Sequence, residues 1–143
     1  MIRRGTEEDI NALVAMGLRF AHDLYHDQLP VTADSLDTFV CAVLDNPKAC
    51  LFVSDGPDGI SGVIVGHVFT HPMSGEDVAA ELAWWVNPEA RGAGVRLLRA
   101  FEDWAEAMGA RQVQMVAPTE RVGAFYERVG YAPVERLYQR SIT

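Results

Sequence analysis

The chain has 143 residues and a net charge of −8; 49% of its residues are hydrophobic and 22% are charged. This is an ordinary globular composition, and the length predicts one domain over residues 1–143. The negative charge disfavours nonspecific nucleic-acid binding, because phosphate contacts need clustered lysine and arginine. No apolar run approaches the ~18 residues of a membrane span, and no apolar signal region opens the chain.

The cysteine content favours a cytoplasmic protein. Cys41 and Cys50 are the only cysteines, which is too few for the disulfide framework of a small secreted protein. His22 and His26 stand four residues apart on an expected helix, but no third metal ligand accompanies them. We therefore expect reduced thiols and no metal site.

The first half of the chain predicts one strand, two helices and an antiparallel meander. Thr6 and Asp9 resemble a capping box, with aspartate in place of glutamate, at the start of the first helix. Apolar periodicity, breakers and turn residues mark the other boundaries. In order, the expected elements are a strand at 2–4, a helix that breaks near Pro30, a helix from 32–34 to Asn46-Pro47, and strands at 49–54, 60–71 and 78–86.

The second half predicts strands that alternate with helices. An amphipathic helix follows the third meander strand, and Gly109 stands where a C-terminal glycine cap belongs. A strand at 112–117, a helix at 120–129 and a last strand at 131–141 complete the chain. Strand–helix–strand units imply a parallel pair with a right-handed crossover. The predicted fold is α/β: a mixed sheet with an antiparallel N-terminal meander, a parallel pair in the second half, and helices on both faces.

The loop between the strand at 78–86 and the next helix has the features of an anion site. Gly92 and Gly94 let the backbone approach an anion without Cβ atoms in the way. The free N–H groups of a helix N-terminus bind phosphate, and Arg91 adds a fixed positive charge. Alone, an R-G-x-G loop could merely link a strand to a helix.

A second motif, V-G-A-F-Y-E-R-V-G-Y at 122–131, follows this loop some thirty residues later. Together with the element order, the two motifs resemble the GNAT superfamily of acyl-CoA-dependent N-acyltransferases over essentially the whole chain. The pyrophosphate motif of that family is matched by Val86, Pro88, Arg91, Gly92 and Gly94. Its tyrosine motif is matched by Phe125, Tyr126, Glu127, Gly130 and Tyr131.

The resemblance implies that acetyl-CoA (coenzyme A) is the cofactor and that its acetyl group passes directly to an amine of a small molecule or peptide. The residues expected to bind the cofactor are Trp85, Val86, Arg91, Gly92, Ala93, Gly94, Val95 and Arg96. Arg96 departs from the family motif, which has glycine or alanine there; it could reach a phosphate itself, or the loop could be tighter and bind the cofactor less well.

Two catalytic residues are expected. Tyr126 is the candidate general acid, because its ordinary pKa of ~10 lies close to that of a departing thiol. Glu81 is the candidate base for the amine; strand alternation groups it with Ala83 and Trp85 on one face, and partial burial would raise its pKa. A charge at the sheet rim is an equally good interpretation of Glu81.

Other polar residues have simpler explanations. His67 and His71 could act as bases, although partly buried histidines are usually structural. The residues from His22 to Asp27 lie in the segment that forms one acceptor-pocket wall in similar proteins, and their acidity suits a cationic amine or simply a solvated helix end. Trp84, Trp85 and Trp104 are most simply core residues.

Three alternatives compete with the transferase. A degenerate member of the same fold could act as an acyl-CoA-binding or protein-interaction module, which Arg96 favours slightly. An acetyltransferase acting on aminoacyl-tRNA is disfavoured by the net charge of −8. A dinucleotide-binding fold would need G-x-G-x-x-G after the first strand, and the glycine spacing here is wrong. The acceptor amine, a homodimer and the acyl preference are left open.

Overall fold

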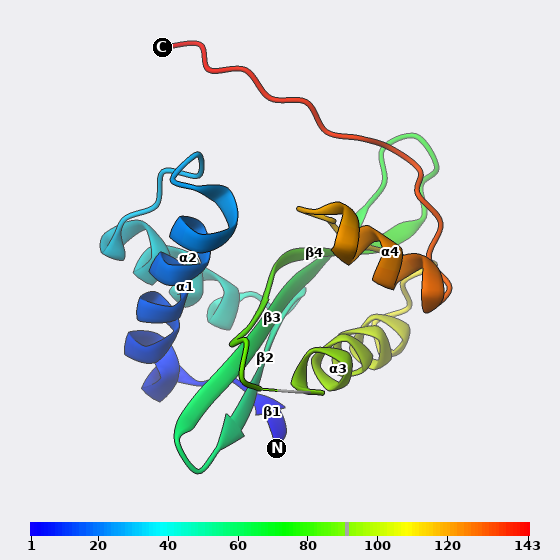
Figure 1. The fold of residues 1–143 in the computed structure, drawn as a ribbon. Helices are drawn as coiled ribbons and strands as arrows, with labels where there is room; N and C mark the ends of the chain where they lie inside the picture. The colour runs from blue at the N-terminus through cyan, green and yellow to red at the C-terminus, as the bar shows by residue number, and fades with distance from the viewer. Residues whose placement is uncertain (91) are drawn as a thin grey trace.

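The computed structural model describes residues 1–90 and 92–143. A five-stranded sheet lies between two layers of helices (Figure 1). The elements are β1 (Ile2–Arg4), a 3-10 turn (Glu7–Asp9), α1 (Ile10–Tyr25), α2 (Ala33–Asp45), β2 (Ala49–Gly56), β3 (Gly59–Thr70), β4 (Asp77–Val86), α3 (Ala93–Ala107), β5 (Gln112–Gln114) and α4 (Glu120–Arg128).

The strands follow one another across the sheet in the order β1-β2-β3-β4-β5. The first three pairings are antiparallel, and β4 pairs with β5 in parallel. This parallel pairing covers only Val78–Ala80 of β4, although the strand continues to Val86. The predicted meander and parallel pair are therefore confirmed, and the two strands separate beyond Ala80.

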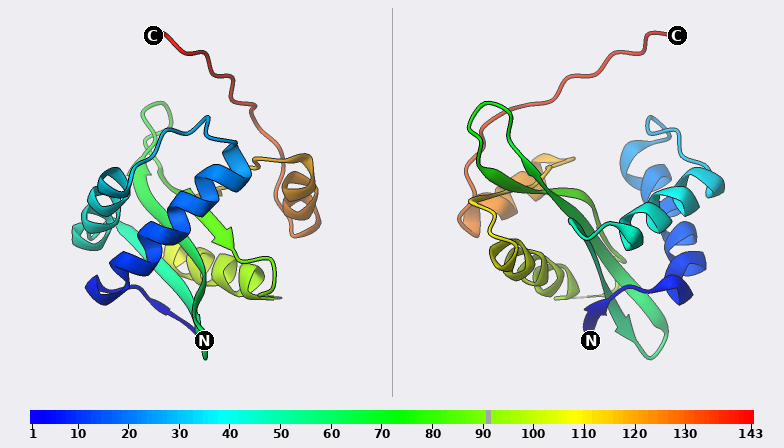
Figure 2. Two further views of the ribbon diagram at one scale, coloured as in Figure 1. Left: turned by 60° about the vertical axis from the view of Figure 1, so that its left-hand side comes forward. Right: turned by 180° about the vertical axis from the view of Figure 1, so that it is seen from behind.

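Each face of the sheet carries its own hydrophobic core. Helices α1 and α2 cover one face, and α3 and α4 cover the other, as Figure 2 shows from two sides. On the α1/α2 face, Leu13 and Met16 pack against Leu51 and Val65. On the other face, Phe101 of α3 is fully buried. All three tryptophans pack against one of these cores, as predicted.

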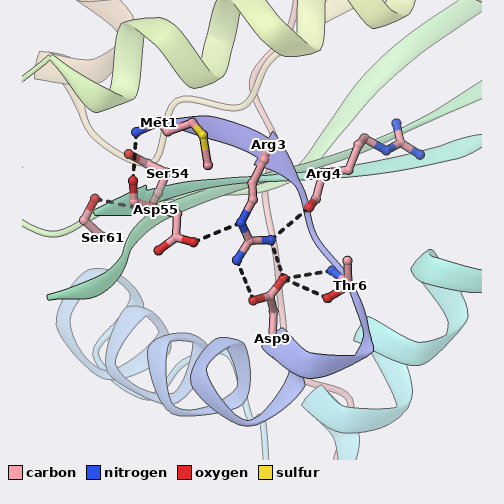
Figure 3. Close-up of polar contacts among 8 residues, drawn as sticks. All are labelled: Met1, Arg3, Arg4, Thr6, Asp9, Ser54, Asp55 and Ser61. Atoms are coloured by element: carbon pink, nitrogen blue, oxygen red, sulfur yellow. Dashed lines mark hydrogen bonds and ion pairs between the residues drawn. The ribbon is translucent and has the colours of Figure 1, made fainter. Parts of the chain in front are cut away.

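A polar network fastens the N-terminal strand to its neighbours (Figure 3). The guanidinium group of Arg3 donates two hydrogen bonds to the carboxylate of Asp9, at 2.8 and 2.9 Å, and a third to Asp55 at 3.0 Å. The same Asp9 carboxylate accepts the backbone N–H of Thr6 at 2.8 Å, which confirms the predicted capping box. The Arg3 guanidinium holds the pKa of Asp9 below its ordinary value.

Two predictions about the C-terminal part are wrong. The strand expected at 112–117 ends at Gln114, where β4 turns away and offers no further partner. The last strand, expected at 131–141, is absent: residues 131–143 run as an extended segment away from the sheet. A strand needs a neighbouring backbone to pair with, and this segment has none among the described residues.

Candidate active site

Helix α3 begins at Ala93 directly after the glycine loop, with Gly92 as its N-cap. The φ of Gly92 is +80°, a left-handed conformation that favours glycine. Within the described residues, no side chain accepts a hydrogen bond from the first turn of α3, and that turn contains no acidic residue. Its backbone donors therefore stay available to an anion. Arg91, the predicted cation of this loop, lies outside the described residues.

Arg96 folds back over this helix end. Its Nη1 atom lies 3.5 Å from the position that a Cβ on Gly92 would occupy. Val95 and Arg96 are exposed in the first turn of α3, whereas Ala93 is buried. The departure from the family motif thus adds a positive charge at the helix N-terminus, where a phosphate would be bound.

Gly94 brings α3 close to the end of β4. A Cβ on Gly94 would lie 3.4 Å from both the Trp84 ring and the Val86 side chain. Beyond Ala80, the edge of β4 that faced β5 has no strand partner in the described part of the chain, so the backbone around Trp85 and Val86 borders an open gap. Unpaired strand groups are available to hydrogen-bond an extended amide-containing ligand.

Glu81 is the first residue of β4 beyond the parallel pairing, and a bulge changes the face that it occupies. Val65 pairs with Ala83 but Gly66 pairs with Glu81, so Leu82 is an extra residue in β4. A Cβ on Gly66 would meet Phe101 of α3, whereas Ala83 packs on the α1/α2 core. The predicted grouping of Glu81 with Ala83 and Trp85 is therefore wrong, because the bulge interrupts the alternation.

The Glu81 carboxylate lies in the gap between β4 and β5. Its Oε1 atom accepts the backbone N–H of Val116 at 3.3 Å. Burial raises the pKa of Glu81 to about 7, and the Val116 N–H offsets part of that effect. A carboxyl group with this pKa can exchange a proton near neutral pH, which a rim carboxylate with an ordinary value does poorly.

Tyr126 reaches the same place from α4. Its side chain is 5% exposed, and its hydroxyl donates a hydrogen bond to the Val116 carbonyl oxygen at 3.0 Å. Burial, together with the negative charge of Glu81, raises the pKa of Tyr126 above its ordinary value. The hydroxyl therefore stays protonated at physiological pH and can donate a proton, but the raised pKa makes it a weaker acid than an ordinary tyrosine and moves it away from the pKa of a departing thiol.

Trp84 links the glycine loop to Tyr126, a role that the sequence did not reveal. Its ring packs next to Gly94 and stacks on Tyr126, with a centroid distance of 5.8 Å and an interplanar angle of 25°. Within the described residues, its indole N–H is the one buried side-chain donor or acceptor without a hydrogen-bond partner. The interpretation of Trp84 as core is confirmed but incomplete.

The opposite side of the gap is formed by the end of α1. Burial, with the negative charge of Glu81 as a smaller cause, raises the pKa of Tyr25 in α1. Tyr25 packs edge-to-face on Phe20, and Phe20 on Trp85. A largely apolar cavity of about 300 Å³ lies between α1, α2 and the sheet, and Phe20, Leu82 and Trp85 line part of it.

The predicted histidine candidates lie apart from this gap or on the surface. His67 on β3 and His71 just after it flank Phe69, with ring-centroid distances of 5.5 and 6.5 Å. His22 and His26 are exposed and line a surface hollow of about 490 Å³ together with Asp23 and Asp27. Residues 1–90 and 92–143 contain no cluster of three side chains that could hold a metal ion. Among the same residues, no helix is long and apolar enough to cross a membrane.

Comparison with solved structures shows the fold. A Clostridium acetobutylicum protein described as a "predicted acetyltransferase with acetyl-CoA" superposes with a TM-score of 0.82 at 15% identity, over 99% of this chain and 96% of that one. An aminoglycoside acetyltransferase from an uncultured soil sample, in complex with trehalose, gives 0.75 at 18% identity, over 100% and 95%. A Bacillus halodurans transcriptional regulator gives 0.80 at 20%, over 99% of both chains.

Sequence comparison shows the family. None of the curated proteins matches the chain. The family model for the acetyltransferase (GNAT) family matches residues 18–131, which include β4, the glycine loop, α3 and the tyrosine motif of α4. Acetyl-CoA is the cofactor of this family, in agreement with the uncapped α3 terminus and the open edge of β4. The chain belongs to the GNAT acetyltransferase family.

Proposed function

We propose that the chain is an N-acetyltransferase that moves the acetyl group of acetyl-CoA directly to an amine of a small molecule or peptide. One observation carries the proposal: Glu81 and Tyr126 meet at Val116, in the gap next to the uncapped end of α3. The arrangement places a carboxyl group with a pKa of about 7 and a protonated phenol at one open strand edge.

The residues around the glycine loop would hold the cofactor. Backbone N–H groups at Ala93 to Val95 and the Arg96 guanidinium would bind its pyrophosphate, and the backbone at Trp85 and Val86 its pantetheine amides. When bound, acetyl-CoA supplies an acetyl group activated as a thioester. Arg91, which matches the pyrophosphate motif of the family, is included among the proposed cofactor-binding residues.

Glu81 and Tyr126 would divide the proton transfers. A protonated amine is not a nucleophile, so the Glu81 carboxylate removes a proton from the acceptor nitrogen. The Tyr126 hydroxyl gives a proton to the departing sulfur, for which it must exchange its hydrogen bond to the Val116 carbonyl. Both side chains are hydrogen-bonded to the backbone of Val116, so both transfers would take place in one gap.

The acceptor would enter from the side of Tyr25. The cavity beside Leu82 and Trp85 is lined mainly by apolar side chains and would receive an apolar part of the acceptor, which leaves the amine near Glu81. The exposed acidic residues Asp23 and Asp27 would attract a cationic amine toward the gap.

A direct assay tests this function. Purified protein is incubated with acetyl-CoA and a panel of amines that contains arylalkylamines, polyamines, amino acids and peptides with a free N-terminus. Mass spectrometry detects the acetylated product, and a thiol reagent detects released coenzyme A. Acetylated product that depends on protein supports the proposal, and arylalkylamines should be preferred to polyamines.

A binding module without transferase activity is the second candidate. The Arg96 departure favours it, and one neighbour of the same fold is described as a transcriptional regulator. Saturable acetyl-CoA binding without turnover on any amine would select this alternative.

We also include a homodimer in the proposal. It is supported by the free edge of β5 and by the extended segment that follows α4.

A further inference from the structure

The indole N–H of Trp84 is a buried hydrogen-bond donor that the fold leaves unused. It has no acceptor among the described residues, and its Nε1 atom is covered by the surrounding side chains. An unpaired buried donor costs free energy, because the group loses its hydration and gains no partner in return. Folded proteins keep few such groups, and a bound ligand that supplies the missing acceptor is one reason to keep one.

The neighbouring tryptophan of β4 shows the contrast. The indole N–H of Trp85 donates to the side-chain oxygen of Asn87 at 3.2 Å, so that donor is satisfied within the chain. Trp85 packs against the core under α1 and α2, whereas Trp84 packs against the core under α3. The unpaired donor therefore lies on the face of the sheet that carries the glycine loop and Tyr126.

The Trp84 ring spans the distance between the start of α3 and helix α4. Its Cζ2 and Cε2 atoms lie 3.4 and 4.0 Å from the position of a Cβ on Gly94, in the first turn of α3. Because Nε1 is bonded to Cε2, the N–H belongs to the ring edge near this helix end. The ring also stacks on Tyr126 of α4, with a centroid distance of 5.8 Å, and lies 6.0 Å from the Phe125 ring.

We propose that the Trp84 indole N–H donates a hydrogen bond to an amide carbonyl oxygen in the pantetheine arm of bound acetyl-CoA. This inference rests on the proposed function, which places the pyrophosphate at the start of α3 and the sulfur at Tyr126. The arm joins these two groups, so it passes the ring that lies between them. An amide carbonyl is a good acceptor, and the indole N–H can only donate, so the two groups are complementary.

The contact requires a tilt of the Trp84 ring. The Nε1 atom is covered, whereas the side chain as a whole is only partly buried. A tilt toward the open edge of β4 brings the N–H to the ligand. Because the same ring stacks on Tyr126, this tilt also changes the packing around the Tyr126 side chain. Trp84 thus couples occupation of the cofactor site to the position of the proposed proton donor.

The first test removes the N–H and keeps the ring. Trp84 is replaced by benzothienylalanine, an analogue of tryptophan with sulfur in place of the indole N–H. Calorimetry should show acetyl-CoA binding about three- to tenfold weaker, the value of one hydrogen bond. The melting temperature of the free protein should not fall, because the lost N–H had no partner there. A lower melting temperature with unchanged affinity would mean a purely structural donor and overturns the proposal.

Trp104 provides the matched control. It lies in α3, packs on the same core and stacks on Phe101 with a centroid distance of 6.1 Å. The same replacement at Trp104 should leave the affinity for acetyl-CoA at the wild-type value. Equal losses of affinity at both positions would reflect a general effect on the core and would contradict a contact made by Trp84.

The second test observes the donor directly by nuclear magnetic resonance. The signal of the Trp84 indole N–H is assigned by its loss in the benzothienylalanine protein. Saturating acetyl-CoA should move this proton signal downfield, as a new hydrogen bond does, and should leave the Trp104 signal in place. ADP has phosphates but no pantetheine arm, so it should not produce the shift. An equal shift with ADP would identify a phosphate oxygen as the acceptor and would overturn the assignment to the arm.

Failure of this inference differs from failure of the proposed function, because neither readout needs turnover. If the wild type binds acetyl-CoA and the Trp84 signal stays in place, the inference is wrong and the transferase proposal is unaffected. If acetyl-CoA binds and shifts the signal but no amine is acetylated, the contact is supported and the transferase is rejected. A wild type that does not bind acetyl-CoA overturns both.

Discussion

Glu81 and Tyr126 are bound to the two polar groups of one peptide residue. The Glu81 carboxylate accepts the N–H of Val116 at 3.3 Å, and the Tyr126 hydroxyl donates to the Val116 carbonyl at 3.0 Å. The carboxylate comes from a strand and the phenol from a helix 45 residues later in number, yet Val116 sets their separation. The negative charge of Glu81 in turn raises the pKa of Tyr126. The acid and the base of the proposed reaction are thus electrostatically coupled.

Replacement of Glu81 by glutamine should remove the base and keep the contact to Val116. We expect kcat/KM to fall by roughly 10²–10⁴. In the wild type, kcat/KM should rise with pH through a midpoint of about 7, since the carboxyl group must lose its proton to act. For Glu81→Gln, the rise of kcat/KM with pH should be absent. Glu76→Gln, in the preceding turn, is the control; an unchanged profile in Glu81→Gln would exclude Glu81 as the base.

Replacement of Tyr126 by phenylalanine removes the hydroxyl and keeps the ring that stacks on Trp84. We expect turnover to fall by roughly 10²–10⁴, with nearly unchanged affinity for acetyl-CoA, because the phenol acts on the departing sulfur. Tyr131→Phe is a matched control, since it loses a hydrogen bond to Glu102 outside the gap. Steady-state kinetics and calorimetry measure the two quantities. Wild-type turnover in Tyr126→Phe would remove this residue from the mechanism.

Arg96 distinguishes a working cofactor site from a degenerate one. If its guanidinium binds the pyrophosphate, Arg96→Ala should weaken acetyl-CoA binding by about 10- to 100-fold, the value of a charge-assisted hydrogen bond. Arg99, also exposed on α3, is one turn farther along, and Arg99→Ala should have little effect. The affinities are measured by calorimetry at two salt concentrations. Tighter binding by Arg96→Ala would mean that this side chain obstructs the site.

The Arg3–Asp9 pair should make stability depend on pH. Because the pKa of Asp9 in the folded protein lies below its ordinary value of 3.8, the pairing stabilises the fold above that pH. This contribution is lost as the pH falls through the lowered value. Asp9→Asn should therefore cost about 1–3 kcal/mol at pH 7, and the difference from wild type should shrink in acid. Urea unfolding at several pH values measures this, with Asp23→Asn as an exposed control. A difference that is constant with pH would contradict the assignment.

Local patterns were sufficient for most of the fold. Apolar periodicity and breakers located the helices and the meander, and the glycine loop marked the start of α3 correctly. The bulge at Leu82 could not be predicted, because residues 82–86 are all apolar and show no alternation that an extra residue would interrupt, so only the pairing with β3 reveals it. Residues 131–141 were predicted as a strand, but a strand also needs a partner backbone, which the local sequence does not reveal.

The sequence predicted which side chains form the candidate site, but not the backbone groups and side-chain conformations that complete it. Tyr126 and the glycine loop were recognisable as motifs, and Glu81 as a carboxylate among apolar residues. Val116 binds Glu81 and Tyr126 through its backbone N–H and C=O alone, so its residue type gives no sign of this contact in the sequence. The position of Arg96 over Gly92 depends on a side-chain conformation at the helix end, which a motif cannot specify.

The most direct test of the central claim is a calorimetric and thermal-shift titration with acetyl-CoA, with NAD and ATP as controls. A ligand at a hundred times its dissociation constant stabilises the folded state by ~2.7 kcal/mol, which shifts the melting temperature measurably. The account predicts selective, saturable stabilisation by acetyl-CoA, reduced in Arg96→Ala. No response at millimolar acetyl-CoA, or an equal response to ATP, would contradict a functional acetyl-CoA site.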